Sequence, residues 1–177
     1  MAAWCWLKYH GFMCWRPLIA LAILVIVATT FVFGTSGQLP EAVATHFGTG
    51  NHADAWMTRV GYRWTMLFFL VAFPLLIAFL VGFLPRLFPR GTNIPNRDHW
   101  LAPERQAASM RFLFAHGCWL GCLNVLMIAG VHYTILEAHR SAPPILPLSL
   151  FLMMMGGFLL GVVVWIGVLF RRFRKPK

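Results

Sequence analysis

Three side chains able to bind a metal ion lie close together between the first two apolar stretches of the chain. His46, His52 and Asp54 flank or follow residues 48–51, a segment of glycine, threonine and asparagine in which positive φ is tolerated. A turn there would place two extended arms side by side and bring the three side chains close in space. Imidazole and carboxylate groups are ligands of zinc and copper, and a firm site needs three or four of them. The alternative is that His46 and Asp54 form hydrogen bonds that hold the loop.

A second candidate metal site lies in the third apolar stretch, where Cys118 and Cys122 are four residues apart. On a helix these two side chains lie within about 40° of each other, and sulfur ligands select soft metals such as Cu(I). The three methionines at 153–155 could supply further sulfur ligands. The alternative is that both cysteines are small packing residues beside Gly117 and Gly121.

The composition of the chain indicates the class of protein in which these residues lie. The chain has 177 residues, of which 59% are hydrophobic and 11% are charged, whereas roughly a quarter of the residues of soluble proteins are charged. Four uncharged stretches, at 17–40, 64–85, 112–136 and 141–170, are each long enough for the ~20-residue helix that crosses a bilayer. A soluble enzyme, a secreted disulfide scaffold and a disordered tail are therefore excluded. The sequence predicts an all-α integral membrane protein, a single domain over residues 1–177, with four transmembrane helices at about 17–35, 64–85, 111–136 and 147–170.

The basic residues indicate how these helices are oriented. Of the 15 Lys and Arg residues, 12 lie before the first stretch, between the second and third, or after the fourth. Basic residues accumulate on the cytoplasmic side, so we expect both termini and the loop 86–111 to be cytoplasmic. The basic tail, 171–177, would contact anionic lipid headgroups. No nucleic-acid-reading module accompanies the net charge of +10, so we expect no nucleic-acid partner.

Small residues indicate how two of the helices pack. Membrane helices associate by close contact at small residues, because lipid is as apolar as leucine. Gly117 and Gly121 are four residues apart in the third span, and Gly157 and Gly161 are four apart in the fourth. We expect these two helices to be antiparallel neighbours that touch through their glycines.

The connection between the second and third spans, called the inner loop, is predicted to be structured. Pro95 disfavours helix in the residue before it, and Pro103 with Glu104 suits the first turn of the next helix. The charged and polar side chains of this loop could contact a ligand or partner, but we expect them to pair with one another; they are Arg97, Asp98, His99 and Glu104. The motif residues of this loop are Asn93, Pro95, Asn96, Trp100, Pro103 and Glu104.

The two loops together resemble those of the SdpI-like membrane proteins, a family sharing a domain of unknown function. In the outer loop, between the first two spans, the matching residues are Leu39, Pro40, His46, Phe47, Asp54 and Trp56, with Asn51 where the family has glycine. The inner-loop stretch 93–105 looks like the family's Asn-Leu-Pro-Asn segment with its Trp-Leu-Ala-Pro-Glu end. The resemblance implies a bacterial cytoplasmic membrane. The family's named member confers immunity to a secreted peptide toxin and holds a repressor at the membrane.

Polar residues within the third span are functional candidates by default. They are His116, Asn124 and His132, and the two histidines lie near Arg111 and Glu137, close to opposite membrane faces, so they need not be desolvated. No nucleophile elbow, P-loop or zinc-protease motif is present. The sequence therefore predicts a non-enzymatic membrane protein without a cofactor, an accessory subunit that binds other membrane subunits, or an immunity or signalling component. A metal or redox protein, using either candidate site above, is the alternative.

Overall fold

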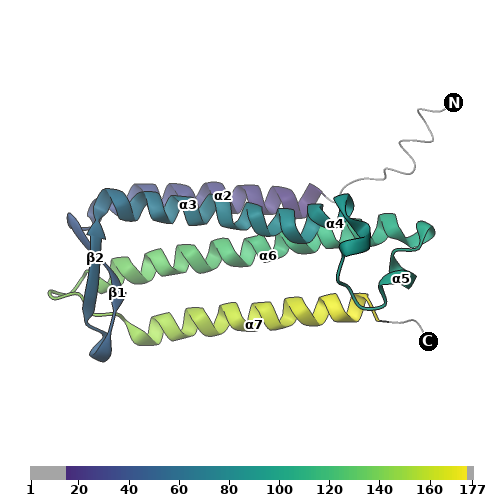
Figure 1. Ribbon diagram of the computed structural model, residues 1–177. Helices are drawn as coiled ribbons and strands as arrows, with labels where there is room; N and C mark the ends of the chain where they lie inside the picture. The colour runs from purple at the N-terminus through teal and green to yellow at the C-terminus, as the bar shows by residue number, and fades with distance from the viewer. Residues whose placement is uncertain (1–14, 175–177) are drawn as a thin grey trace.

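Four long helices dominate the computed structural model, which describes residues 15–174 (Figure 1). Each belongs to a helical segment long and apolar enough to cross a membrane, which confirms the predicted four spans. The predictions for residues 1–14 and 175–177 lie outside the described residues. The helices are α2 (Trp15–Thr35), α3 (Arg59–Ala78), α6 (Pro103–Ala138) and α7 (Leu148–Arg172).

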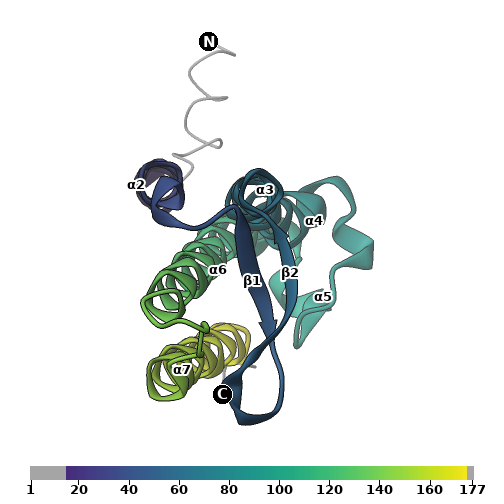
Figure 2. The same cartoon turned by 90° about the vertical axis from the view of Figure 1, so that its left-hand side faces the viewer.

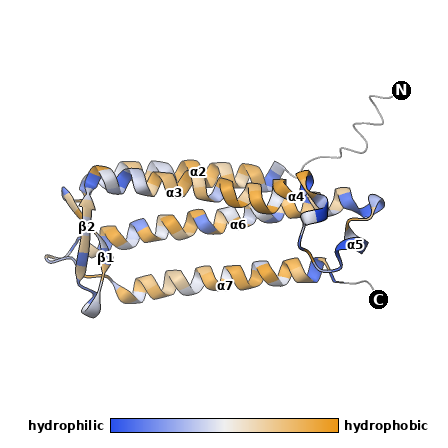
Figure 3. Cartoon of the chain, in the orientation of Figure 1, coloured by the Kyte–Doolittle hydropathy of each residue, from blue (hydrophilic) through white to orange (hydrophobic). Residues whose placement is uncertain are grey.

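The helices run up and down between two ends of the bundle (Figure 1). The hairpin end carries the connection from α2 to α3 and the connection 139–147. The loop end carries the inner loop and both ends of the described chain. Hydrophobic residues follow the helices, and hydrophilic ones gather toward the two ends (Figure 3), which is the pattern of a bilayer-spanning bundle.

The second span is longer than predicted and changes its helical form along its length. Thr58 caps the start of α3, since its Oγ1 accepts a hydrogen bond of 3.1 Å from the N–H of Gly61. Pro74 lies inside α3, which continues through a π-helical turn, η3 (Phe79–Phe83), into α4 (Leu84–Leu87). Two short helical turns, η4 (Pro89–Gly91) and α5 (Arg97–Trp100), then form the inner loop together with the residues between them and the start of α6.

The outer loop is a β-hairpin, so the all-α prediction is wrong at this one place. Strands β1 (Ala42–Phe47) and β2 (Ala53–Thr58) pair antiparallel. Gly50 and Asn51 take positive φ, at 71° and 62°, in the turn η2 (Thr49–Asn51). The predicted reversal between two extended arms is confirmed, and backbone pairing between the arms makes them strands.

Helix α6 is the centre of the bundle. Seen from the hairpin end, it lies between α2 and α3 on one side and α7 on the other (Figure 2). Half of the residues in its most apolar stretch are buried, whereas none are in α7. The main core packs Leu21 and Val32 of α2 and Leu70 of α3 against Phe114 and Val125 of α6. The main buried core is therefore shared by three of the four long helices.

Gly117 and Gly121 of α6 contact α2 and the second span, which corrects the predicted contact of these two glycines with α7. A Cβ at Gly117 would lie 3.2 Å from the backbone nitrogen of Gly82, and one at Gly121 would lie 3.2 Å from Leu21 and 3.3 Å from the carbonyl oxygen of Pro74. Both glycines therefore allow backbones to approach closely. The prediction failed because a four-residue spacing of glycines identifies a helix face of small side chains but does not identify the helix that packs against it.

Helices α6 and α7 are neighbours as predicted, but other residues hold them together. A Cβ at Gly161 would lie 3.0 Å from Leu123, and Gly130 lies directly against the side chain of Met154. Gly157 has nothing within 4 Å of its Cβ position. Both of these contacts place a glycine of one helix against a larger side chain of the other.

Candidate functional site

The hairpin is docked on the end of α6. Val43 and Ala44 of β1 are fully buried. The N–H of Ala44 donates to His139 Nε2 over 3.1 Å, and His139 Nδ1 donates to the carbonyl of Ile135 over 2.8 Å. These two bonds assign the proton of His139 to Nδ1. The ring of Trp56 meets His139 edge to face at 6.4 Å. His139 thus joins the hairpin to α6.

The tip of the hairpin is also fixed, on the connection between α6 and α7. The N–H of Leu146 donates to the carbonyl of Asn51 over 2.9 Å, and His52 pairs with Ile145 as an isolated β-bridge. The hairpin therefore crosses the bundle end and is held at both of its own ends.

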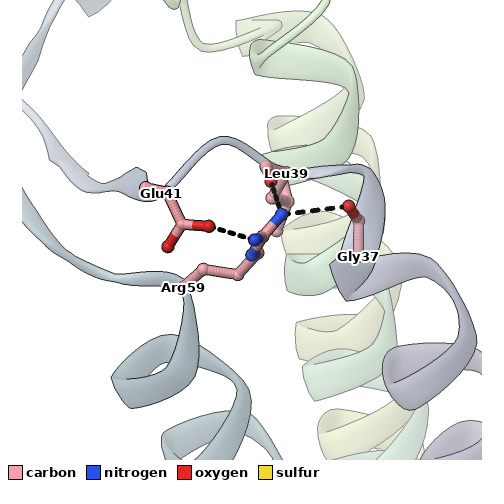
Figure 4. A network of polar contacts seen from close by, with 4 residues as sticks. All are labelled: Gly37, Leu39, Glu41 and Arg59. Carbon is pink, nitrogen blue, oxygen red and sulfur yellow. Dashed lines mark hydrogen bonds and ion pairs between the residues drawn. The ribbon is translucent and has the colours of Figure 1, made fainter.

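Arg59 ties the hairpin to the preceding segment (Figure 4). Its guanidinium donates to the carbonyls of Gly37 and Leu39 over 3.2 and 2.9 Å and forms an ion pair with Glu41. A planar guanidinium suits this arrangement because its donors point in several fixed directions. One side chain at the start of α3 thus holds residues 37–41 in place.

The predicted three-ligand metal site does not form among residues 15–174, where no three His, Cys, Asp or Glu side chains are close enough to hold a metal ion. His46 and Asp54 do pair, with Nδ1 and Oδ1 2.5 Å apart and both side chains more than half exposed. His52 is placed at the turn by its bridge to Ile145. The remaining outer-loop motif residue, Phe47, packs against the cluster of Leu39, Val43, Tyr62 and Ile135.

The cysteines of α6 do not face the methionines of α7. Cys118 and Cys122 are buried free thiols within the core shared with α2 and α3. Met153 is 70% exposed, and Met154 lies against Gly130. This geometry does not bring cysteine and methionine together as the Cu(I) hypothesis requires, and it fits the alternative in which the cysteines are packing residues.

His132 lies at the centre of a buried polar network that joins three helices. Its ring is fully buried, so the nearby membrane face does not leave it hydrated. Tyr62 Oη of α3 lies 2.8 Å from His132 Nδ1, and Thr35 Oγ1 of α2 lies 2.8 Å from Nε2. The Thr35 hydroxyl donates to the carbonyl of Phe31 over 2.6 Å. Because that proton is committed, Nε2–H must donate to Thr35.

The same bonds define the state of the imidazole. The partners of His132 are two hydroxyl groups and not a carboxylate, so nothing in contact with the ring would compensate a positive charge in this buried site. A neutral ring protonated on Nε2 accepts from Tyr62 at Nδ1 and satisfies every polar atom in the chain of bonds. The network therefore has a structural role, because it links α2, α3 and α6.

His116 links α6 to α7 in a similar way. It is also buried, and its ring stacks on Trp165 with centroids 4.3 Å apart. His116 Nε2 donates to the carbonyl of Trp165 over 3.0 Å, and Trp165 Nε1 donates back to the carbonyl of His116 over 2.9 Å. Asn124, in contrast, bonds to the carbonyl of Leu120 in its own helix.

The inner loop holds the end of α7. Asn96 Nδ2 and Trp100 Nε1 both donate to the carbonyl of Phe173, over 2.9 and 3.0 Å. Asn96 adopts left-handed backbone with φ of 52°. The guanidinium of Arg172 lies 4.4 Å from the Trp100 ring centroid. These contacts satisfy a carbonyl that the helix leaves without an internal donor.

Other inner-loop predictions are met in part. Arg97 and Asp98 pair at 3.3 Å. Pro103 begins α6 with Glu104 in its first turn, as predicted. Pro95 and Asn96 contribute to a shallow depression beside the end of α7.

An apolar groove lies between α4 and α7 beside the inner loop. It is lined by Val81 and Leu84 on one side, by Trp165 and Leu169 of α7 on the other, and by Leu113 of α6, and it encloses about 550 Å³. Residues 91–94 line its loop end. This volume is within the roughly 300–1,000 Å³ typical of small-molecule sites.

No family model, curated protein or solved structure matches this chain. The resemblance to the SdpI-like family therefore remains a prediction from the loop motifs.

Several residues that organise these sites were not singled out in the sequence. Arg59, Tyr62 and His139 each connect a hairpin-end element to another, and Arg172 and Trp165 fix α7. A signal existed for some of them, since a polar side chain at the edge of an apolar stretch requires a partner. The identity of that partner depends on contacts distant in sequence.

Proposed function

We propose that this chain is a non-enzymatic integral membrane protein that acts by binding, as an accessory subunit of a larger membrane complex, and that α7 is the helix that binds the partner. The observation that carries the proposal is the exposure of α7. None of its residues is buried, whereas each of the other three spans buries part of its surface. A second membrane-spanning helix is the partner proposed for this surface.

The arrangement of side chains around α7 supports this proposal. Met154, Gly161 and Trp165 face α6. Gly156 and Gly167 lie on the opposite side, within about 20° of each other on a helix of 3.6 residues per turn. Nothing lies within 4 Å of the Cβ position of either glycine.

Glycine in a helix costs about 1 kcal/mol relative to alanine. Glycines inside the bundle, such as Gly117 and Gly121, offset that cost by permitting close contact. Gly156 and Gly167 have no such contact within the described chain, so a helix from another subunit is proposed to supply it.

The polar residues of the described chain support binding over chemistry. The side chains of His116, His132 and His139 each form hydrogen bonds that join one element of the fold to another. We place the basic loop end in the cytoplasm of a bacterial cell, following the charge distribution. An immunity or signalling role, which the family resemblance implies, would use the exposed face of the hairpin with His46, Asp54 and Trp56.

The test is extraction of the full chain from its native membrane in mild detergent, with the particle mass and co-purifying chains measured. We expect a particle larger than the chain alone, and loss of the partner in the double variant Gly156→Leu/Gly167→Leu. Gly34→Leu is the matched control, because this glycine of α2 is also free of contacts within 4 Å. A lone chain in the wild type, or partner loss in the control as well, would contradict the proposal.

A further inference from the structure

The apolar groove between α4 and α7 continues into a polar depression at the loop end. Residues 91–94 line both, so one short segment separates the apolar walls from the charged surface. The depression is lined by Arg97 and Asp98, and an adjoining one by Arg90 and Arg97. A molecule lying across residues 91–94 would contact hydrocarbon side chains at one end and guanidinium groups at the other.

The cations of this depression retain donors for a ligand. Arg97 uses Nε toward Asp98 and one terminal nitrogen toward the carbonyl of Arg90, at 3.3 and 2.8 Å. The side chain of Arg90 is exposed and forms no hydrogen bond or ion pair within residues 15–174. Asp98 neutralises part of the charge of Arg97, which leaves Arg90 as the stronger anion-binding group.

The surrounding charge has the same sign. Among the described residues of the inner loop and of the helix ends that adjoin it, nine arginines accompany only two carboxylates, those of Asp98 and Glu104. The arginines are Arg16, Arg86, Arg90, Arg97, Arg105, Arg111, Arg171, Arg172 and Arg174. Basic pockets between membrane helices on the cytoplasmic side bind anionic lipid headgroups.

We propose that this groove binds an anionic phospholipid, with one acyl chain between α4 and α7 and the phosphate against Arg90 and Arg97. Two features together indicate this lipid. An apolar cavity opens from the membrane-spanning surface, and an arginine whose charge is not neutralised lies at the depth of the headgroups. The groove is lined by Trp165 and Leu169, which lie on a different side of α7 from Gly156 and Gly167. The lipid site is therefore separate from the surface proposed for a partner helix.

The experiment measures lipid retention by native mass spectrometry on the full chain in detergent. Phosphatidylglycerol and phosphatidylcholine with identical acyl chains are titrated separately, so that only the headgroup charge differs. The variant is Arg90→Gln/Arg97→Gln. The control is Arg105→Gln/Arg174→Gln, which removes the same charge from the loop end at two residues that do not line the groove.

We expect the wild type to retain phosphatidylglycerol in preference to phosphatidylcholine. The Arg90→Gln/Arg97→Gln variant should lose about 30-fold in phosphatidylglycerol affinity, since each basic residue near an anionic lipid contributes roughly fivefold, and the control should lose far less. Equal retention of both lipids, or equal losses in the two double variants, would overturn the proposal in favour of diffuse surface charge.

A second variant tests the acyl chain directly. Leu84→Trp introduces a larger side chain at the wall of the groove without changing the charge. It should lower phosphatidylglycerol binding while Leu87→Trp, on the same short helix but outside the groove lining, leaves it unchanged. Equal binding by the two tryptophan variants, or a co-purified peptide occupying the groove in place of lipid, would overturn the assignment.

Discussion

Removing the hydroxyl of Tyr62 should destabilise the bundle through His132. In Tyr62→Phe the ring stays in place, but Nδ1 of His132 loses its only donor while remaining fully buried. An unpaired buried acceptor costs about 1–3 kcal/mol in proteins generally. Interhelical hydrogen bonds in membranes average about 0.6 kcal/mol, with a maximum near 1.7. We therefore expect a loss of about 1 kcal/mol in the free energy of unfolding.

The hydrogen-bond chain also predicts coupling between distant positions. Tyr62 donates to His132, His132 donates to Thr35, and Thr35 donates to the carbonyl of Phe31. Members of one network have interaction energies of about 0.5–3 kcal/mol. Thr35→Val should therefore destabilise by a similar amount, and the double variant should lose less than the sum of the two single losses.

The assay is reversible unfolding by sodium dodecyl sulfate in mixed micelles, followed by far-ultraviolet circular dichroism. Tyr133→Phe is the control, because Tyr133 is the next residue along from His132 and is 45% exposed. Equal unfolding free energies for Tyr62→Phe and Tyr133→Phe would refute the reasoning. Nitrogen-15 NMR of the imidazole gives an independent check, since a proton on Nδ1 in place of Nε2 would also contradict the network.

Three further predictions concern the contacts that fix the hairpin and α7. Arg59→Gln should release residues 37–41 and speed proteolysis of the hairpin, whereas an unchanged cleavage rate would mean that the guanidinium is dispensable. Trp100→Phe removes the indole donor to Phe173 and should raise amide hydrogen exchange at the end of α7, with a local loss of about 1 kcal/mol; unchanged exchange there would argue against the cap. Gly130→Leu would collide with Met154 and should lower the melting temperature in detergent, and an unchanged value would contradict the close packing of α6 and α7.

The four spans and the reversal in the outer loop could be predicted because their causes are local. An uncharged stretch long enough to cross a bilayer is a property of consecutive residues. The hairpin turn likewise follows from Gly50 and Asn51, which both adopt positive φ. The start of α6 at Pro103 could also be predicted from local sequence, because proline suits the first helical position.

The assignments that failed depend on how each helix is rotated about its axis. The spacing of Gly117 and Gly121 correctly identifies a close-packing face, but the partners on that face come from α2 and α3. Cys118 and Cys122 are candidates for a shared metal site or for packing, and the same rotation turns them toward the core, where they pack. Periodicity along one helix carries no information on which neighbour occupies the opposite side.

The burial of His132 could not be predicted for a related reason. Its position near Glu137 at the end of the third span suggested access to water, but residues 70 and 97 positions away along the chain supply its hydrogen bonds. Those partners, Tyr62 and Thr35, lie near the ends of their own apolar stretches. Polar residues at matching depths in different spans are thus candidates for pairing, although depth alone does not select the pair.

The distribution of burial has a consequence for how the molecule works. Helices α2, α3 and α6 form a core that is closed by the His132 network, whereas α7 attaches to it through the His116–Trp165 pair and through the inner-loop cap on Phe173. Apolar side chains contribute little between helices in lipid, so such polar and close-packed contacts determine the position of α7. A partner helix on α7 or a lipid in the adjoining groove would act on the least enclosed span, where displacement disrupts the fewest contacts of the core.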